Sequence, residues 1–199
     1  ADAFTARGYV VVIPDYRTYP NVRFPAFVED AARATAWVHR HIGAYGGNPQ
    51  ALFLLGHSAG AYNAAMLLAD DAYLAAHGLS PAVLRGFAGL AGPYDFTPQS
   101  RTYRRIFNER EDYQPIHVSR YLDGNEPPML LLHGTQDITV SPEHTRRLHS
   151  AIAAKGGQSR RTLYEGIGHY EIIGTLTVYW RHKAPVLDET DRFFTSHLP

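Results

Sequence analysis

The stretch Gly56-His57-Ser58-Ala59-Gly60 has the pattern G-x-S-x-G. It follows the apolar run Leu52–Leu55 and precedes 61–69, a segment rich in helix-forming residues. A strand, a sharp turn and a helix are therefore predicted around one serine. That is the local context of a nucleophile elbow, a strained turn that exposes the serine hydroxyl. Such a tight turn admits only small flanking side chains, a demand that we expect Gly56 and Gly60 to meet.

A serine hydroxyl is a weak nucleophile, so it needs a general base, and the base needs an acid that orients it. Asp137 lies just past the apolar strand candidate 129–132, and His169 lies on a glycine-rich loop past the strand candidate 161–164. The carboxyl ends of parallel strands meet at one edge of a sheet, where sites of open α/β sheets form. The order Ser58, Asp137, His169 therefore predicts one site with nucleophile, acid and base.

Other residues could take these roles. The chain has eleven histidines, and only the position of His169 after the last strand selects it. We expect His57 to be a packed or hydrogen-bonded residue of the elbow, and His133 and Gly134 to shape the loop of the acid. Glu171 and Asp188 stay open as alternative acids. Asp15 and Arg17 are expected to form structural hydrogen bonds.

Several stretches together resemble carboxylesterases of the α/β-hydrolase superfamily, in the hormone-sensitive-lipase-like branch that includes feruloyl-esterase-like and kynurenine-formamidase-like proteins. The resemblance covers nearly the whole chain and is carried by 8–17, 24–30, 45–49, the elbow, and the loops that hold Asp137 and His169. It implies a mainly parallel sheet flanked by helices, nucleophile Ser58, acid Asp137 and base His169.

One departure from the family concerns the N-terminal part. Family members carry an H-G-G-G or H-G-G-x-W loop that supplies oxyanion donors, and this sequence has none. They also have about three strands before the segment that corresponds to 10–14. Without them, a strand-wide gap is expected between 10–14 and 52–55. The hypothesis is that these 199 residues are part of a longer polypeptide.

Strands and helices alternate along the chain, which predicts one α/β domain over 1–199. Expected strands are 10–14, 52–55, 84–90, 129–132 and 161–164; expected helices are 26–41, 59–69, 142–155 and 186–197. Residues 93–128 lack a clear period and are predicted to form a cap-like insertion over the site. Its aromatic residues either wall a substrate pocket, which would favour apolar esters, or merely pack the insertion against the body: Tyr94, Phe96, Tyr103, Phe107, Tyr113 and Tyr121.

Composition excludes several classes of function. The formal net charge is zero and no long basic run occurs, so nucleic-acid binding has no electrostatic support. No apolar stretch is long enough to span a membrane. Cysteine is absent, which excludes disulfides and a thiol nucleophile. No metal site and no cofactor are expected. The compartment stays open, with a cytoplasmic location favoured, and the oligomeric state is open too.

The predicted function is a serine hydrolase that cleaves small carboxylic esters through an acyl-enzyme, with the Ala59 N–H as an oxyanion donor. One alternative is an arylformamidase, another amide hydrolase or a thioester hydrolase of the same fold. A second alternative is a binding protein that kept the hydrolase fold without catalysis. Fold alone does not decide among them.

Overall fold

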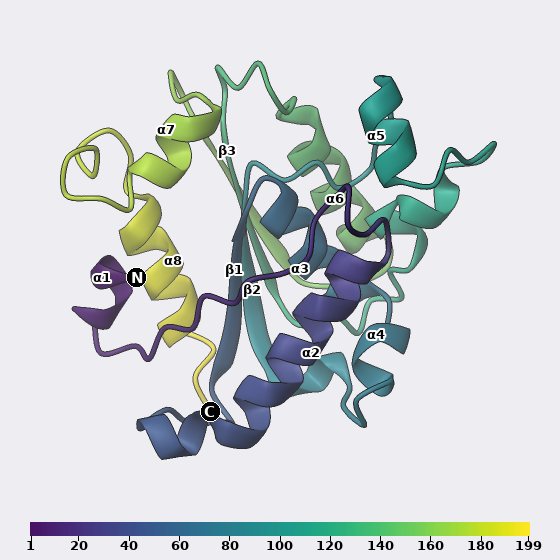
Figure 1. Cartoon of the computed structure of the whole chain (residues 1–199). Coiled ribbons are helices and arrows are strands. Elements are labelled where there is room, and N and C mark those ends of the chain that lie inside the picture. The colour runs from purple at the N-terminus through teal and green to yellow at the C-terminus, as the bar shows by residue number, and fades with distance from the viewer.

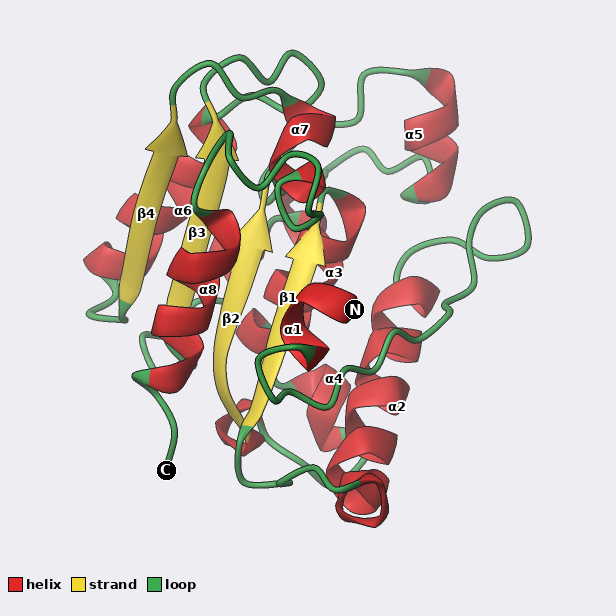
Figure 2. Ribbon diagram, turned by 90° about the vertical axis from the view of Figure 1, so that its left-hand side faces the viewer, coloured by secondary structure: helices red, strands yellow, loops and turns green.

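A four-stranded parallel sheet forms the centre of the computed structural model, which describes all residues 1–199. Its strands are β1 (Leu52–His57), β2 (Leu84–Leu90), β3 (Met129–Gly134) and β4 (Ser159–Tyr164), and they are ordered in the sheet as they are in the sequence. All four point the same way, so their carboxyl ends share one edge, at the top of Figure 2. The α/β fold class expected from the alternating pattern is confirmed.

Helices cover both faces of the sheet (Figures 1 and 2). On one face, α3 (Ala59–Ala69) packs on β1 and β2, α6 (Glu143–Ala154) packs on β3 and β4, and α2 (Ala26–His41) packs on α3. On the other face, α8 (Val186–Thr195) packs on β2 and β3, with α1 (Asp2–Thr5) beside it. The remaining short helices are α4 (Ala72–Ala75), α5 (Arg101–Ile106), α7 (His169–Gly174), η1 (Ile42–Tyr45), η2 (Pro81–Val83), η3 (Gln114–Ile116) and η4 (Val118–Arg120).

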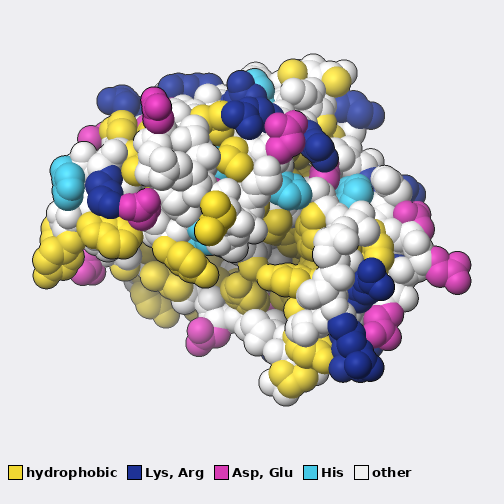
Figure 3. Space-filling view, turned by 90° about the horizontal axis from the view of Figure 1, so that it is seen from above, with side chains coloured by type: hydrophobic (Ala, Val, Ile, Leu, Met, Phe, Trp, Pro, Cys, Tyr) yellow, Lys and Arg dark blue, Asp and Glu magenta, His cyan; other side chains and the backbone are white.

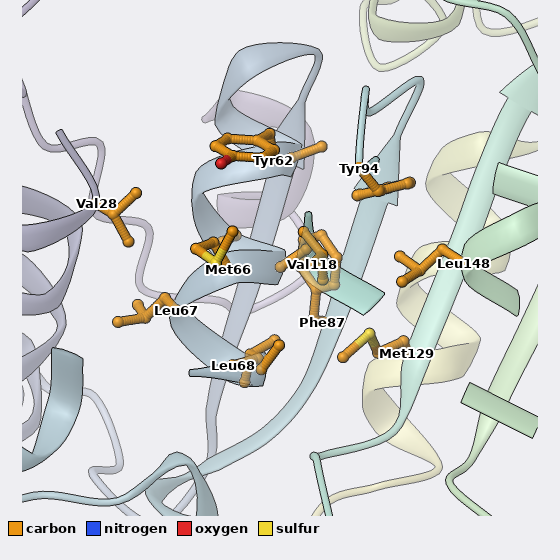
Figure 4. Packing of buried hydrophobic residues seen from close by; sticks show 14 of the residues in the cluster. Val28, Tyr62, Met66, Leu67, Leu68, Phe87, Tyr94, Val118, Met129 and Leu148 are labelled. Carbon is orange, nitrogen blue, oxygen red and sulfur yellow. The ribbon is translucent and has the colours of Figure 1, made fainter. Parts of the chain in front are cut away.

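Alternation of side chains along the central strands divides the core into two clusters. Phe87 of β2 and Met129 and Leu131 of β3 point into the larger cluster, under α2, α3 and α6 (Figure 4). Their neighbours Ala88 and Leu130 belong to the second cluster, under α8. Strands buried on both faces are near-continuous apolar runs, and β2, interrupted only near its start by Arg85, and β3 were recognisable from the sequence for this reason.

The strand expected at 10–14 is not formed. None of the residues 10–17 takes part in a backbone–backbone hydrogen bond, and Val10, Val12 and Ile13 are 44%, 42% and 75% exposed. A strand is stabilised by its ladder with a neighbour, and this segment pairs with none. Its apolar sequence alone therefore gave a wrong prediction, and β1 is an edge strand of the sheet.

The segment is instead held by side chains at its two ends. At the start, Arg7 binds Asp188 and Asp191 of α8, and the Tyr9 hydroxyl donates to Asp191. At the end, the Arg17 guanidinium binds both carboxylate oxygens of Asp30 in α2 at 2.8 Å. The structural role expected for Arg17 is thus confirmed, whereas Asp15 makes no side-chain hydrogen bond or ion pair.

Candidate active site

Ser58 occupies the turn between β1 and α3, with φ 53° and ψ −120°. A positive φ is strained for a residue with a side chain and is tolerated where the surrounding structure enforces it. Here the Ser58 N–H donates to the Leu90 carbonyl at 2.9 Å, which ties the turn to the end of β2. The structure therefore has the strand–turn–helix geometry predicted for a nucleophile elbow.

The turn requires a glycine at position 56 but leaves room for a side chain at position 60. A Cβ atom at Gly56 would lie 2.5 Å from the backbone carbonyl group of Gly60. A Cβ atom at Gly60 would meet nothing within 4 Å. The expectation was thus right for Gly56 and wrong for Gly60. A side chain at Gly56 would collide with the Gly60 backbone, whereas a side chain at Gly60 would point into open space.

The His169 side chain lies between Ser58 and Asp137. Its Nε2 is 2.9 Å from the Ser58 hydroxyl oxygen, and its Nδ1 is 2.7 Å from Asp137 Oδ2. His169 is the first residue of α7, a short helix that the sequence did not reveal, and only 6% of the residue is exposed. Three residues that follow β1, β3 and β4 therefore meet at the carboxyl edge of the sheet, as their positions had predicted.

The Asp137 carboxylate is stabilised in its charged form. Oδ1 accepts hydrogen bonds from the Thr139 and Val140 N–H groups at 2.9 and 2.8 Å. Burial by itself raises the pKa of Asp137, but the hydrogen bonds from Val140, His169 and Thr139 outweigh it, so the pKa lies below its usual value. Asp137 is therefore ionised at neutral pH and can accept a hydrogen bond from the N–H at His169 Nδ1.

His133 contacts the same oxygen of this carboxylate as His169 does. Its Nε2 lies 3.1 Å from Asp137 Oδ2 and 3.0 Å from the Val140 carbonyl, and its Nδ1 lies 2.8 Å from the Thr145 hydroxyl. Burial lowers the pKa of His133, which keeps the ring neutral. Because Nε2 faces two acceptors, it carries the proton, and the Thr145 hydroxyl donates to Nδ1. His133 therefore shapes the acid loop, as the sequence had suggested.

His57 is a hydrogen-bonded residue of the elbow, again as expected. Its Nε2 lies 2.9 Å from the His169 carbonyl oxygen, and the two imidazole rings are 4.8 Å apart. Burial lowers the pKa of His57, so the neutral ring donates from Nε2 to the carbonyl. This contact fixes the backbone of His169. In the sequence, the only signal for such a contact was the position of His57 next to Ser58.

The two alternative acids lie elsewhere. The Glu171 carboxylate accepts from the Gly168 N–H at 2.9 Å and binds Lys183. Asp188 binds Arg7. Neither carboxylate makes a hydrogen bond with His169, whereas Asp137 does.

The start of α3 offers N–H groups beside Ser58. Ala59 is the first residue of this eleven-residue helix, so its N–H has no acceptor within the helix. The positive end of the helix dipole lies at the same point. Both features favour a negative charge next to the Ser58 hydroxyl. Seen from the carboxyl edge of the sheet, the surface is hollowed, with hydrophobic side chains in the hollow and histidines at its edge (Figure 3).

The aromatic rings of the insertion 93–128 divide between core and surface. Tyr94 is fully buried and Phe107 is 5% exposed, and both belong to the larger core cluster. Phe96 packs edge-on against Tyr62 of α3, with ring centroids 5.8 Å apart. Tyr103, in contrast, is 56% exposed. For Tyr94, Phe96 and Phe107 the packing interpretation holds, and Phe96 and Phe107 both pack against Tyr62 of α3.

Two further findings concern metal binding and membrane-spanning helices. No group of three or more His, Asp or Glu side chains is arranged to hold a metal ion. None of the helices combines the length and the apolar character that crossing a membrane requires.

The chain matches one family model, and similar proteins are named as esterases. The model of a family described as the alpha/beta hydrolase fold matches residues 3–172. A probable isoprenylcysteine alpha-carbonyl methylesterase from Oryza sativa subsp. japonica is 29% identical over 187 residues, which cover 83% of this chain and 45% of that protein. Esterase LipQ from Mycobacterium tuberculosis is 30% identical over 176 residues, covering 75% of this chain and 39% of LipQ. The chain thus spans less than half the length of these relatives.

Solved structures show the same fold. The apo form of Thermogutta terrifontis esterase 2 superimposes with a TM-score of 0.75 at 24% identity, covering 92% of this chain and 69% of that one. A truncated carbohydrate esterase from gut microbiota gives a TM-score of 0.77 at 17% identity, covering 92% of this chain and 72% of the other.

Proposed function

Because this chain belongs to the α/β-hydrolase fold family, we propose that it cleaves carboxylic esters with Ser58 as the nucleophile, His169 as the base and Asp137 as the acid. One observation carries the proposal: the continuous hydrogen-bonded path from the Ser58 hydroxyl through His169 to Asp137, with contacts of 2.9 and 2.7 Å. Nucleophile, base and orienting acid within hydrogen-bond reach are what nucleophilic catalysis by serine requires.

Acylation begins when the Ser58 oxygen attacks the ester carbonyl carbon. His169 Nε2 takes the hydroxyl proton, and Asp137 holds the proton on Nδ1 and stabilises the imidazolium. The tetrahedral intermediate then collapses, the C–O bond to the alcohol breaks, and His169 returns the proton to the leaving oxygen. Water, deprotonated by His169, attacks the acyl-enzyme in the same way and releases the acid and the free serine.

The oxyanion of each tetrahedral intermediate needs donors that are in place before the reaction. We assign one of them to the Ala59 N–H, which is free of helix hydrogen bonding and lies next to Ser58. The loss of a single donor of this kind costs roughly 10²–10³ in kcat. This N–H therefore supplies a large share of the stabilisation expected at the site.

The names of the relatives suggest which substrates to try first. The rice protein is named a methylesterase and LipQ an esterase, so small alkyl esters are the proposed substrate class. A panel of p-nitrophenyl esters with acyl chains of increasing length, feruloyl methyl ester and the methyl ester of a prenylated cysteine tests it. N-formylkynurenine and an acyl thioester in the same panel test the amide and thioester alternatives.

The assignment of the residues is tested by turnover of the best substrate. Ser58→Ala is expected to lower kcat by roughly 10⁶, by analogy with serine proteases whose triad acts as a unit. The matched control is Ser80→Ala, an exposed serine whose hydroxyl makes no hydrogen bond. If Ser58→Ala kept more than a tenth of the activity, or if Asp137→Ala and His169→Ala were harmless, the assignment would fail.

A further inference from the structure

A cavity lies in the insertion, and its lining does not include Ser58, His169 or Asp137. Its volume is about 440 Å³. Its lining residues come from α5 and the loops on either side of it, and six of them carry a guanidinium, hydroxyl or amide group: Thr97, Gln99, Arg101, Arg104, Arg110 and Tyr113. Nothing in the proposed hydrolysis uses these residues.

Positive charge in this cavity is not balanced by the protein. Arg101, Arg104 and Arg110 have no carboxylate within 4.0 Å, although seven other arginines of the chain have one. The one acidic residue in the lining, Glu109, is bound by Arg105 at 3.5 Å. Three arginines therefore line one cavity, and the single carboxylate of the lining is already paired.

Arg110 is the most strongly constrained of the three. Its Nε is buried and has no hydrogen-bond partner, although a buried N–H donor without a partner is costly. Its guanidinium carbon lies 5.7 Å from the centre of the Phe24 ring, a cation–π distance. The aromatic ring holds the cation in place but supplies no acceptor for the N–H. An acceptor from a bound molecule would complete the hydrogen bonding of this side chain.

The walls of the cavity are fastened to the rest of the fold. The Ser100 hydroxyl caps α5 by accepting from the Tyr103 N–H at 3.2 Å. Beyond α5, the Asn108 side chain donates to the Phe24 carbonyl at 2.6 Å, and the Phe24 N–H donates to the Ile106 carbonyl at 2.9 Å. The arginines are thus presented by a backbone that is connected to the segment before α2, which favours binding without reorganisation.

We propose that this cavity binds the carboxylate or phosphate group of a small molecule. A guanidinium is planar and donates two parallel N–H bonds, a geometry that matches both oxyanions. The polar side chains of Thr97, Gln99 and Tyr113 can hydrogen-bond the remaining oxygens. The site is independent of the proposed hydrolysis, so it can be tested on protein whose catalytic serine is absent.

The test is isothermal titration calorimetry on the Ser58→Ala protein, with inorganic phosphate and glutarate as the two probes. Saturable binding of at least one of them is expected, and the stronger probe identifies the preferred oxyanion. Added to this background, Arg104→Gln and Arg110→Gln are each expected to raise Kd by about 10-fold, since each removes a charge-assisted hydrogen bond. Glu109→Gln is expected to lower Kd, because it removes the one negative charge of the lining.

Arg161→Gln is the matched control, because Arg161 is exposed on β4 and forms no ion pair. Circular dichroism verifies that each variant is folded. If Arg110→Gln is unfolded because it disturbs the contact with Phe24, Arg101→Gln on the exposed side takes its place with the same expectation. The proposal is overturned if neither probe shows saturable binding at concentrations up to about 10 mM, or if Arg161→Gln weakens binding as much as the lining variants do.

Discussion

Gly56 sets the distance between β1 and α3 at the elbow, and this gives the first prediction at the scale of single residues. Gly56→Ala forces a Cβ atom to within 2.5 Å of the Gly60 carbonyl group and should cost about 1–3 kcal/mol of stability. For a chain of this size, that lowers Tm by about 2–12 °C. Differential scanning calorimetry measures the change.

Gly60→Ala is the matched control, because its Cβ atom meets nothing within 4 Å. Alanine is preferred over glycine in a helix by roughly 0.5–1 kcal/mol, so this variant should raise Tm by about 1–4 °C. Equal losses in the two variants would show that the close approach at Gly56 is not what limits the turn.

His57 gives the second prediction at this scale. It acts as a positioning residue, since its hydrogen bond to His169, at 2.9 Å, is made to the backbone carbonyl and not to the imidazole. His57→Leu removes a hydrogen bond worth about 1 kcal/mol and should lower kcat by about 3- to 10-fold with little change in KM. His57→Gln, which keeps an N–H donor, should restore part of kcat. If both variants behaved alike, the hydrogen bond would have no role in catalysis.

Individual residues of the site could be predicted because each occurs in a recognisable local pattern. The serine is marked by G-x-S-x-G, and Asp137 and His169 by their positions after apolar strands. The contacts that orient them were less predictable. The hydrogen bond from His57 to the His169 carbonyl joins residues 112 positions apart, and no local pattern encodes such a contact.

At the scale of elements, α8 is joined to β4 by one buried carboxylate. Glu189 of α8 accepts hydrogen bonds from the Thr162 hydroxyl at 2.5 Å and the Tyr164 hydroxyl at 2.7 Å. Burial and the hydrogen bond to Glu189 raise the pKa of Tyr164 well above its usual value, so this hydroxyl stays protonated and donates. These contacts fasten the C-terminal helix to the strand that precedes His169.

Glu189→Leu should therefore destabilise the protein by about 1–3 kcal/mol, because it leaves the two hydroxyls without their acceptor. Urea unfolding measures the loss, and Glu165→Ala, an exposed neighbour of Tyr164, is the control. In the double variant with Tyr164→Phe the losses should not add, since one hydroxyl has been removed together with its acceptor. Full additivity would contradict the link between the two elements.

The four strands of the sheet and the long helices were predicted well, and the short helices were not. Residues 26–41 and 59–69 form α2 and α3 as expected, and residues 84–90 form β2. The helices α5 and α7 have six residues each, too few for a periodic pattern to stand out. For the segment 10–14 the error was the opposite one: a strand was predicted where none forms. Its apolar residues resemble a strand, but a strand also requires a neighbour to pair with.

At the scale of the whole molecule, the ion pair between Arg17 and Asp30 joins the N-terminal segment to α2. The hydrogen bonds from Arg17 lower the pKa of Asp30 below its usual value. A carboxyl group with a lowered folded-state pKa stabilises the fold fully above its unfolded-state pKa of about 3.9. This contribution is lost as the pH falls through the lower folded-state pKa.

Asp30→Asn should consequently be less stable than the parent at pH 5–7, and the difference should shrink as the pH falls below about 4. Unfolding by urea at a series of pH values measures both proteins. Asp15→Asn is the control, because Asp15 makes no ion pair and should leave the curve unchanged. A difference that stayed constant down to pH 2 would contradict a role for the Asp30 charge.

The overall architecture could be predicted because it depends on the order of strands and helices along the chain rather than on individual side-chain contacts. Alternating strands and helices lead to a parallel sheet, and a parallel sheet brings the loops after β1, β3 and β4 to one edge. The fold of the insertion could not be predicted in the same way, since residues 93–128 have no period. The arginine-lined cavity there became visible only when α5 and the adjoining loops were placed together.

The central claim is that His169 and Asp137 make the Ser58 hydroxyl reactive. The most direct measurement is labelling with a fluorophosphonate probe, followed by mass spectrometry of the peptides. We predict one adduct per chain, located on Ser58, which forms far more slowly in His169→Gln and Asp137→Ala. An adduct on another serine, or labelling of Ser58 at the same rate in all three proteins, would contradict the claim.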